Sequence, residues 1–442
     1  GLDKYGAERL AAALAKHGAL TELDVGRNRI KDRGAQALAA ALEENGTLAV
    51  LGLRGCGIRE AGGQRLAAAL AINGSLRELS LGHSRLGDAG ATAIAEALEQ
   101  NTALKELDLA SSCIEEQGGV RLAAALERNS TLEVLKLYDN SIGDEAAAGF
   151  AKALALRSCS IRELDLSRCG IGLQGAEHLG TALATAECSL AALSLLGSEL
   201  GAEGAGAVAA AVEKSRTLRE LELSCCGLGE AGAAAVGACL AKNRSLRELR
   251  LSRNGIGERG AALLGEGLEQ NRSLLVLSAR ENEICDQGAL ALAESLKKNR
   301  GLKELELCGN SIGVMGARAL GSALTLNRVL KTLNLQDNGG LGDDGAEGLA
   351  LGLEANAALA ELDLGRCGVG DVGAGRLAHA LGQNCTLSTL ELHGNPASPE
   401  VVDAVAKVAS CVEERKKAKE AAEAAAAGAA LQKRGGGAGK AA

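Results

Sequence analysis

Apolar residues recur along nearly the whole chain in units of 28 or 29 residues. The segment Leu246–Ile256 shows the pattern clearly, with leucine at its first, fourth and sixth positions, asparagine at the ninth and isoleucine at the eleventh. Self-similarity at a fixed period of this length is typical of a solenoid, in which each repeat packs against its neighbours. The units open at Leu20, Leu48, Leu76, Leu104, Leu132, Ile161, Leu190, Leu218, Leu246, Leu274, Leu302, Leu330, Leu359 and Leu387.

Each unit contains a short alternating segment followed by a helical one. Apolar and polar residues alternate in Leu20–Val25, the period of a half-buried strand. Apolar residues recur at helical spacing in Gly257–Asn271. Asp32 is predicted to cap its own helix, and Asn45 to close that helix in a left-handed conformation. Stacked units of this kind predict an α/β horseshoe solenoid, with a parallel sheet on the concave face and the wider helices on the convex face.

The ninth position of each unit carries asparagine, cysteine or serine, all of which can donate a hydrogen bond. Because the chain turns inward at this position, we expect these side chains to satisfy backbone carbonyls that have no sheet partner. This ladder comprises Asn28, Cys56, Asn140, Cys169, Cys226, Asn254, Asn282, Asn310, Asn338, Cys367 and Asn395, together with Ser84, Ser112 and Ser198.

The repeats also predict the domain boundaries. We expect a solenoid over residues 1–395, formed by a partial first repeat and 14 units, then a capping helix over 396–432 and a disordered low-complexity tail over 433–442. The chain opens in the helical half of a repeat without an initiator methionine, so we expect it to be part of a longer protein.

Composition bears on the classes of partner and chemistry. The net charge of -8 argues against nucleic acid as a partner, and no apolar run is long enough to span a membrane. The 13 cysteines form no C-x-x-C pair, which favours buried reduced thiols in a cytoplasmic or nuclear protein over disulfides or a metal site. The five histidines lie in no recognisable nucleophile motif, so we expect neither an enzyme nor a cofactor.

The units, for example LRELRLSRNGIGERGAALLGEGLEQN at 246–271, closely resemble the ribonuclease-inhibitor class of leucine-rich repeats. The resemblance covers about Leu2 to Asn395, and the mostly unbroken 28-residue units look most like the repeats of NOD-like receptors. It implies a horseshoe that binds protein partners as a scaffold or sensor region. Two alternatives remain open, a GTPase activator of the Ran-activator type and a structural subunit of a large assembly.

Acidic residues dominate the outward positions of the predicted strands, where they would form a stripe that attracts a partner with a basic surface. Tyr138 occupies one of these outward positions, and exposed tyrosines are frequent interface anchors. An ordinary solvated face and an incidental surface aromatic remain the alternative interpretations. The candidate partner-binding residues are Tyr138, Lys136, Glu106, Asp108, Glu163, Asp165, Glu220, Glu222, Glu248, Arg250, Glu304 and Glu306.

Overall fold

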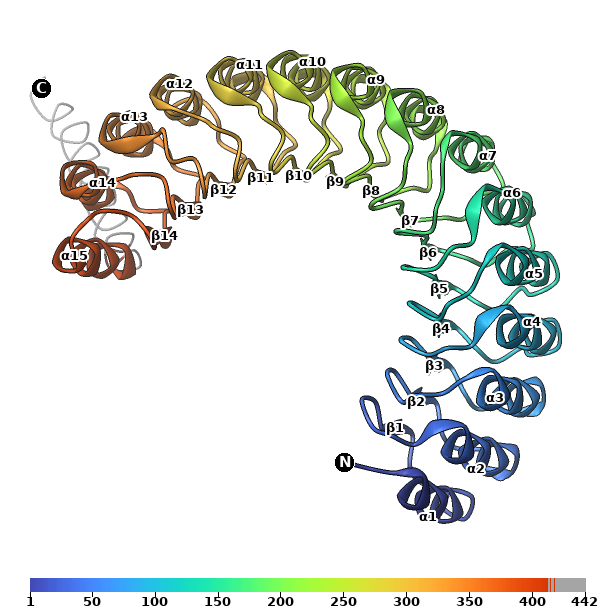
Figure 1. The fold of residues 1–442 in the computed structure, drawn as a ribbon. Coiled ribbons are helices and arrows are strands. Elements are labelled where there is room, and N and C mark those ends of the chain that lie inside the picture. The colour runs from blue at the N-terminus through green and yellow to red at the C-terminus, as the bar shows by residue number, and fades with distance from the viewer. Residues whose placement is uncertain (412–413, 415–416, 418–442) are drawn as a thin grey trace, which may run out of the picture. The chain divides into compact units, whose positions relative to one another are not determined.

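The computed structural model describes residues 1–411, 414 and 417 as a regular alternation of strands and helices. The chain divides into two compact units, Gly1–Asn254 and Gly255–Ala442. Within each unit the strands are parallel and follow one another in sequence order, and the helices lie on the outer side of the strands (Figure 1). The predicted fold class, an α/β solenoid with a parallel sheet on one face and helices on the other, is confirmed.

Among the described residues, each named strand is three residues long and each named helix spans between 11 and 14 residues. The first unit contains α1 (Lys4–Leu14), β1 (Glu22–Asp24), α2 (Lys31–Glu44), β2 (Val50–Gly52), α3 (Glu60–Ile72), β3 (Glu78–Ser80), α4 (Gly87–Leu98), β4 (Glu106–Asp108), α5 (Glu116–Leu126), β5 (Val134–Lys136), α6 (Gly143–Leu154), β6 (Glu163–Asp165), α7 (Leu173–Leu183), β7 (Ala192–Ser194), α8 (Gly201–Lys214), β8 (Glu220–Glu222), α9 (Gly229–Lys242) and β9 (Glu248–Arg250). The described part of the second unit contains α10 (Gly257–Gln270), β10 (Val276–Ser278), α11 (Cys285–Lys298), β11 (Glu304–Glu306), α12 (Val314–Leu324), β12 (Thr332–Asn334), α13 (Gly342–Ala355), β13 (Glu361–Asp363), α14 (Asp371–Gln383), β14 (Thr389–Glu391) and α15 (Pro399–Ser410).

The core lies between the strands and the helices and consists of repeated leucine layers. The central leucine of each strand faces the helices, as Leu135 of β5 and Leu164 of β6 illustrate. These two residues pair in register, and both side chains are buried. The helices complete each layer with leucine and alanine, as Leu122 and Ala123 do in α5. Because the same layer recurs in every repeat, the stack needs almost no aromatic residues to fill its interior.

Asp32 does not cap its own helix, so the prediction for this residue is wrong. The residue that precedes α2 is Ile30, which makes no side-chain capping bond. Oδ1 of Asp32 instead accepts hydrogen bonds from the N–H groups of Arg59 (2.7 Å) and Gly62 (3.2 Å) at the start of α3. Stacking brings the next helix start within reach, so the cap acts between repeats. Equivalent bonds to the following repeat are made by Asp88, Asp144, Asp286, Asp343 and Asp371.

The prediction for Asn45 is wrong as well, because its φ of -85° and ψ of 121° are extended and not left-handed. Its Nδ2 donates to the carbonyls of Leu14 (2.8 Å) and His17 (3.0 Å), one repeat earlier. Its Oδ1 accepts from the N–H groups of Thr47 (3.0 Å) and Leu48 (2.8 Å). This asparagine therefore joins consecutive repeats. The same bridge recurs at Asn73, Asn101, Asn129, Asn243, Asn299, Asn327, Asn356 and Asn384.

The ladder after the strands is made mainly by asparagine and cysteine. Asn338 donates to the carbonyls of Leu307 (3.0 Å) and Leu335 (2.7 Å), and the thiol of Cys226 donates to the carbonyl of Leu195 (3.1 Å). Serine fills the same role at Ser112, whose hydroxyl donates to the carbonyls of Leu81 (3.5 Å) and Ala110 (3.2 Å), but the prediction is wrong at the other two serines. These are Ser84 and Ser198, whose buried hydroxyls have no hydrogen-bond partner among the described residues.

The helix α15 packs against α14 and β14, with Val405 buried. Ser398 precedes α15 but makes no side-chain capping bond, and its N–H donates to Oδ1 of Asp371 at 2.6 Å. Hydrogen bonds from the backbone and side chain of Ser398 lower the pKa of Asp371 below its ordinary value. The predicted continuation of this helix to residue 432 and the predicted tail at 433–442 lie outside the described residues, so these boundaries stay predictions.

Replacing Gly321 with alanine is expected to destabilise the second unit by about 1–3 kcal/mol, the usual cost of overpacking. A Cβ atom at Gly321 in α12 would overlap the carbonyl oxygen of Gly348 in α13, so the two helices would have to separate. Gly375→Ala in α14 is the control, because a Cβ there meets no atom within 4 Å. It should stabilise the protein by about 0.5–1 kcal/mol. Chemical denaturation compares the two, and equal effects would contradict the close helix contact.

Candidate functional site

The strand face is the surface formed by the first and third residues of the three-residue strands. Successive side chains of a strand point to opposite sides, so these residues lie away from the buried central leucine. In the first unit, the first positions of six of the nine strands are glutamates. Neighbouring parallel strands lie about 4.8 Å apart, which concentrates negative charge along this row. The six glutamates are Glu22, Glu78, Glu106, Glu163, Glu220 and Glu248.

Carboxylates at the third positions differ from those at the first, because they accept hydrogen bonds from the turn that follows their own strand. Oδ1 of Asp165 accepts hydrogen bonds from the N–H (2.9 Å) and hydroxyl (2.5 Å) of Ser167. Oε1 of Glu222 accepts from the N–H of Ser224 at 2.6 Å. Burial raises the pKa of Glu222, although the hydrogen bonds from Ser224 act to lower it. The candidate residues therefore divide into projecting glutamates and carboxylates that support the backbone.

Two basic residues on the strand face neutralise neighbouring glutamates. Nζ of Lys136 lies 2.6 Å from Oε1 of Glu106, and Arg250 pairs with Glu248 on its own strand. Partial burial alone would lower the pKa of Lys136, but the hydrogen bond to Glu106 and the nearby carboxylates outweigh burial and raise it. Exposed pairs of this type contribute only about 0–1 kcal/mol, so a partner can displace them at small cost.

Four of the six first-position glutamates have no ion-pair partner among the described residues. One is Glu22 of β1, at the start of the unit; the others are Glu78 of β3, Glu163 of β6 and Glu220 of β8. Glu163 is half-buried and the other three are exposed, so negative charge is available to a partner at these positions.

In the second unit the candidate pair Glu304 and Glu306 lies on β11. Arg280, two residues beyond β10, makes a forked contact with Glu306, with Nε to Oε2 at 3.0 Å and Nη2 to Oε1 at 2.9 Å. A bidentate pair of this geometry is stronger than a single contact. Glu306 is therefore mainly an internal partner of Arg280, which weakens its candidacy as a partner-binding residue.

Tyr138 follows β5 and belongs to a cluster that spans four repeats. Its hydroxyl accepts a hydrogen bond from Nη2 of Arg54 (2.5 Å), and the same nitrogen lies 2.6 Å from Nε2 of His83. The rings of Tyr138 and His83 meet edge to face, with centroids 6.4 Å apart. Nη1 of Arg54 lies 3.9 Å from Oδ2 of Asp108. Tyr138 is half-buried and held in this cluster, whereas its outward position in the sequence predicts an exposed anchor.

Arg54, His83 and Arg280 lie just beyond their strands, beside the strand face, and are absent from the predicted partner-binding residues. Arg54 and Arg280 occupy the same repeat position as Tyr138, two residues beyond the strand. Comparing that position across all units would have found both arginines. No local signal relates Arg54 to Tyr138, because the two residues are 84 positions apart.

A hollow of about 320 Å³ lies on the strand face over β6 to β9. The half-buried Leu196 contributes an apolar wall, and Glu163 and Glu220 lie at its edges together with Glu222 and Arg250. An apolar wall beside carboxylates suits a lysine or arginine side chain, which has an aliphatic stem and a charged head.

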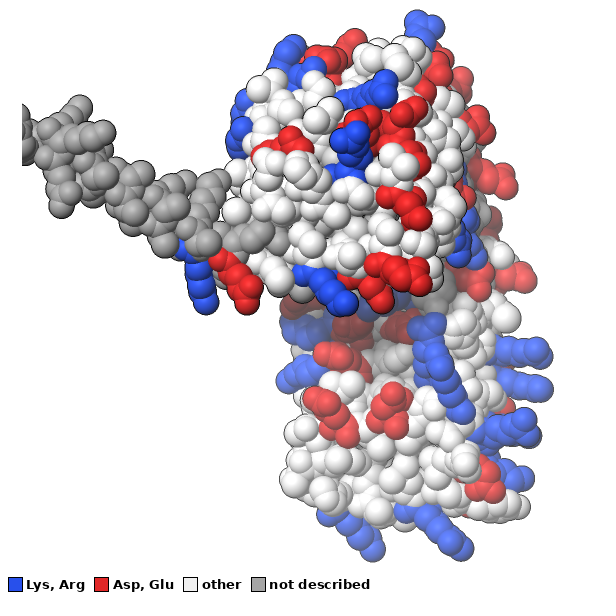
Figure 2. All heavy atoms as spheres, turned by 90° about the vertical axis from the view of Figure 1, so that its left-hand side faces the viewer, with Lys and Arg blue, Asp and Glu red and all other residues white. Residues whose placement is uncertain are grey.

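Three kinds of feature could indicate a function elsewhere on the described chain, namely charged patches, metal-binding groups and membrane-spanning helices. Figure 2 views the molecule toward α14 and α15, where acidic and basic side chains are interspersed. The part of the chain that the structure describes contains no group of three or more His, Cys, Asp or Glu residues that could hold a metal ion. No described helix is both long enough and apolar enough to cross a membrane.

Comparison with known proteins identifies the repeat type. The leucine-rich repeat family model matches nine segments of the chain, at residues 20–39, 73–95, 100–123, 128–151, 157–180, 214–237, 242–265, 326–350 and 355–378. The sequence matches no curated protein.

Two solved structures are similar to parts of the fold. One, from the crystal structure of the yeast Rad7 and Elc1 complex, is 18% identical, with 91% of this chain and 86% of that chain covered and a TM-score of 0.47. The other, actin-binding site 2 of leiomodin-1, is 21% identical, with 39% of this chain and 83% of that chain covered and a TM-score of 0.26. Both scores are below 0.5, so neither structure carries an argument about function.

Proposed function

The fold and the nine matched segments make this chain a leucine-rich-repeat solenoid, and on that premise we propose that it is a non-enzymatic scaffold whose strand face binds a protein partner with a basic surface. One observation carries the proposal. Unpaired glutamates at Glu78, Glu163 and Glu220 lie on one continuous face, and two of them border the hollow that contains Leu196. We further propose that the repeats are of the ribonuclease-inhibitor class, closest to those of NOD-like receptors, and that the protein works in the cytoplasm.

The geometry favours insertion of basic side chains from the partner. A lysine or arginine stem would lie along Leu196, while its charged head would pair with Glu163 or Glu220. Tyr138 is already held by Arg54 and His83, so ordering this aromatic on binding would cost little conformational entropy. Negative charge on the face would also speed the encounter with a basic partner.

The proposal predicts that reversing three of the unpaired charges removes partner binding. The variant Glu78→Lys, Glu163→Lys and Glu220→Lys should weaken the affinity for a captured partner by at least about tenfold, because like charges then face one another. Affinity capture identifies the partner, and binding of the purified partner measures the loss.

The control carries the same charge change on the helices, as Glu44→Lys, Glu177→Lys and Glu203→Lys, all exposed residues without an ion-pair partner among the described residues. This control should retain the partner. Equal retention by both variants would place recognition away from the strand face. Acceleration of GTP hydrolysis by a captured small GTPase would instead support a GTPase activator, and a fixed-stoichiometry assembly would support a structural subunit.

A further inference from the structure

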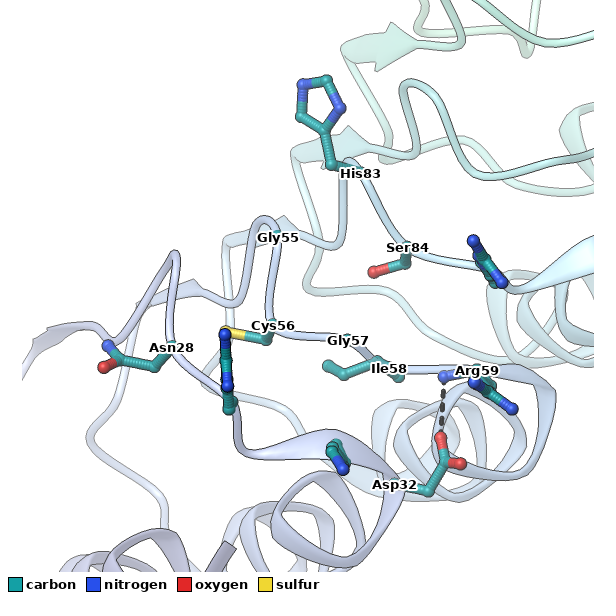
Figure 3. Close-up of a pocket in the computed structure, with 12 residues that line it drawn as sticks. Asn28, Asp32, Gly55, Cys56, Gly57, Ile58, Arg59, His83 and Ser84 are labelled. Atoms are coloured by element: carbon teal, nitrogen blue, oxygen red, sulfur yellow. Dashed lines mark hydrogen bonds between the residues drawn. The ribbon is translucent and has the colours of Figure 1, made fainter. Parts of the chain in front are cut away.

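A second hollow lies at the edge of the first unit, where β1, β2 and β3 lead into the following helices (Figure 3). Its volume is about 690 Å³, within the range of small-molecule sites. Four basic side chains line it, and Asp32 is its one acidic residue. The four are Arg29, Lys31, Arg59 and Arg85.

These four basic side chains have no ion-pair or hydrogen-bond partner among the described residues, and all four are exposed. The carboxylate of Asp32 already accepts the N–H groups of Arg59 and Gly62. Nearby arginines on the helices behave differently, since Arg33 pairs with Glu8 and Arg65 pairs with Glu43. Four cations therefore line the hollow against the single carboxylate of Asp32, so its lining carries a net positive charge.

The ladder is interrupted in the same hollow. Where the ladder residue is Asn140, its Oδ1 accepts the N–H groups of Ser112 (3.1 Å) and Ile114 (2.9 Å) in the preceding repeat. Ser84 occupies this position two repeats earlier, and its hydroxyl is too short to make the equivalent bonds.

Three polar groups of the hollow are left without partners as a result. The N–H groups of Cys56 and Ile58 have no acceptor among the described residues. The hydroxyl of Ser84 has no hydrogen-bond partner among them either. Ser84 is only 3% exposed, and Figure 3 shows its hydroxyl turned toward the loop that contains Cys56 and Gly57. Two N–H donors and one hydroxyl therefore lie beside four cations and can donate hydrogen bonds to a bound acceptor.

The hollow beside Asn140 provides an internal comparison. It measures about 330 Å³, and its charged lining residues are the acidic Glu115 and Asp139. The asparagine fills the space and satisfies the backbone there. The hollow beside Ser84 is therefore larger than the hollow beside Asn140, and its charged lining is mainly basic where that of the other is acidic.

We infer that the basic hollow binds a small molecule that carries more than one phosphate group. Phosphate oxygens accept strong hydrogen bonds from backbone N–H groups and hydroxyls, and arginine pairs with them in a forked geometry. One phosphate would take the donors near Ser84, and a second would lie between Arg29 and Arg85 at the exposed edge. This inference concerns a different surface from the strand face and does not depend on the proposed partner.

Calorimetric titration of the whole chain with pyrophosphate tests the inference. Arg29→Gln with Arg85→Gln should weaken pyrophosphate binding at least about tenfold, because two charge-assisted contacts are lost. Arg33→Gln with Arg65→Gln makes the same change in net charge on the helices and should leave the affinity unchanged. Inorganic phosphate should bind at least about tenfold more weakly than pyrophosphate, because it cannot contact both groups of donors.

Ser84→Asn separates a specific site from general attraction to positive charge. The amide oxygen would accept the N–H groups of Cys56 and Ile58, so the variant should melt at a higher temperature and bind pyrophosphate at least about tenfold more weakly. The inference is overturned if the wild-type chain does not bind millimolar pyrophosphate, if Ser84→Asn binds as tightly as wild type, or if both arginine pairs lose affinity equally. The charge-reversed strand-face variant should bind pyrophosphate normally.

Discussion

Replacing Asn140 with leucine is expected to lower the free energy of unfolding by at least about 3 kcal/mol. The side chain is 6% exposed and makes four hydrogen bonds to backbone groups. Nδ2 donates to the carbonyls of Leu109 (3.0 Å) and Leu137 (2.7 Å), and Oδ1 accepts the N–H groups of Ser112 and Ile114. Leucine has a similar volume but no polar atom, so three of the four backbone groups would lose their partner at once, and the carbonyl of Leu137 would keep only the thiol of Cys169. Each unpaired buried group costs about 1–3 kcal/mol before the chain relaxes.

Ser198→Ala is the matched control, because Ser198 holds the same ladder position but its buried hydroxyl has no partner among the described residues. Removing that hydroxyl should change stability by less than about 0.5 kcal/mol or raise it slightly. Chemical denaturation measures both variants. In a solenoid each repeat contacts only its neighbours, so hydrogen exchange at Ser112 and Ile114 should show where the loss begins. A stability loss in Ser198→Ala as large as that in Asn140→Leu would mean that the ladder bonds do not govern stability.

The period of the sequence predicts the fold because each apolar position has the same environment in every repeat. A leucine such as Leu164 is buried by the leucines directly before and after it in the stack, so one repeat predicts all the others. Capping rules based on neighbouring residues fail where a polar side chain can reach a partner either on its own helix or in an adjacent repeat. Asp32 and Asn45 both take the partner in the adjacent repeat, 27 to 31 residues away in sequence.

The same limit applies to the candidate site. Alternation within each strand predicts that Glu163 and Glu220 face outward, and the structure places them on the strand face. The alternation does not predict which side chains pair along the stack. Arg54 contacts Tyr138, 84 residues away in sequence, and Arg280 contacts Glu306, 26 residues away. Such pairs depend on the length and direction of side chains, which a repeat pattern leaves open. They decide which carboxylates remain available to a partner.

Cys226 is expected to react with a thiol-alkylating reagent about a thousandfold more slowly than its neighbour Cys225 in the folded protein at pH 8. Burial raises the pKa of Cys226 to about 12, and its thiol donates to the carbonyl of Leu195 at 3.1 Å. A thiol of ordinary pKa, about 8.5, is roughly one-quarter ionised at pH 8, whereas a thiol of pKa 12 is ionised to about one part in ten thousand. The thiolate is the reactive form, so the small ionised fraction slows Cys226, and burial of its side chain also limits access of the reagent, which offsets the greater nucleophilicity of a thiolate of high pKa. The side chain of Cys225 is exposed to the reagent, so the comparison needs no change of sequence.

Mass spectrometry of a labelling time course measures both rates within one peptide. Labelling in concentrated urea is the control, because unfolding exposes both thiols and should bring their rates within about threefold of each other. In the second unit Cys367 should behave as Cys226 does, since burial raises its pKa to about 12 and its thiol donates to the carbonyl of Leu335 at 3.0 Å. Equal labelling of Cys225 and Cys226 in the folded protein would show that the ladder thiol is not buried. Selective labelling of Cys225 would instead show that the ladder thiol of Cys226 is buried and protonated. A protonated thiol can donate a hydrogen bond, which is the role that the ladder cysteines have in the stack.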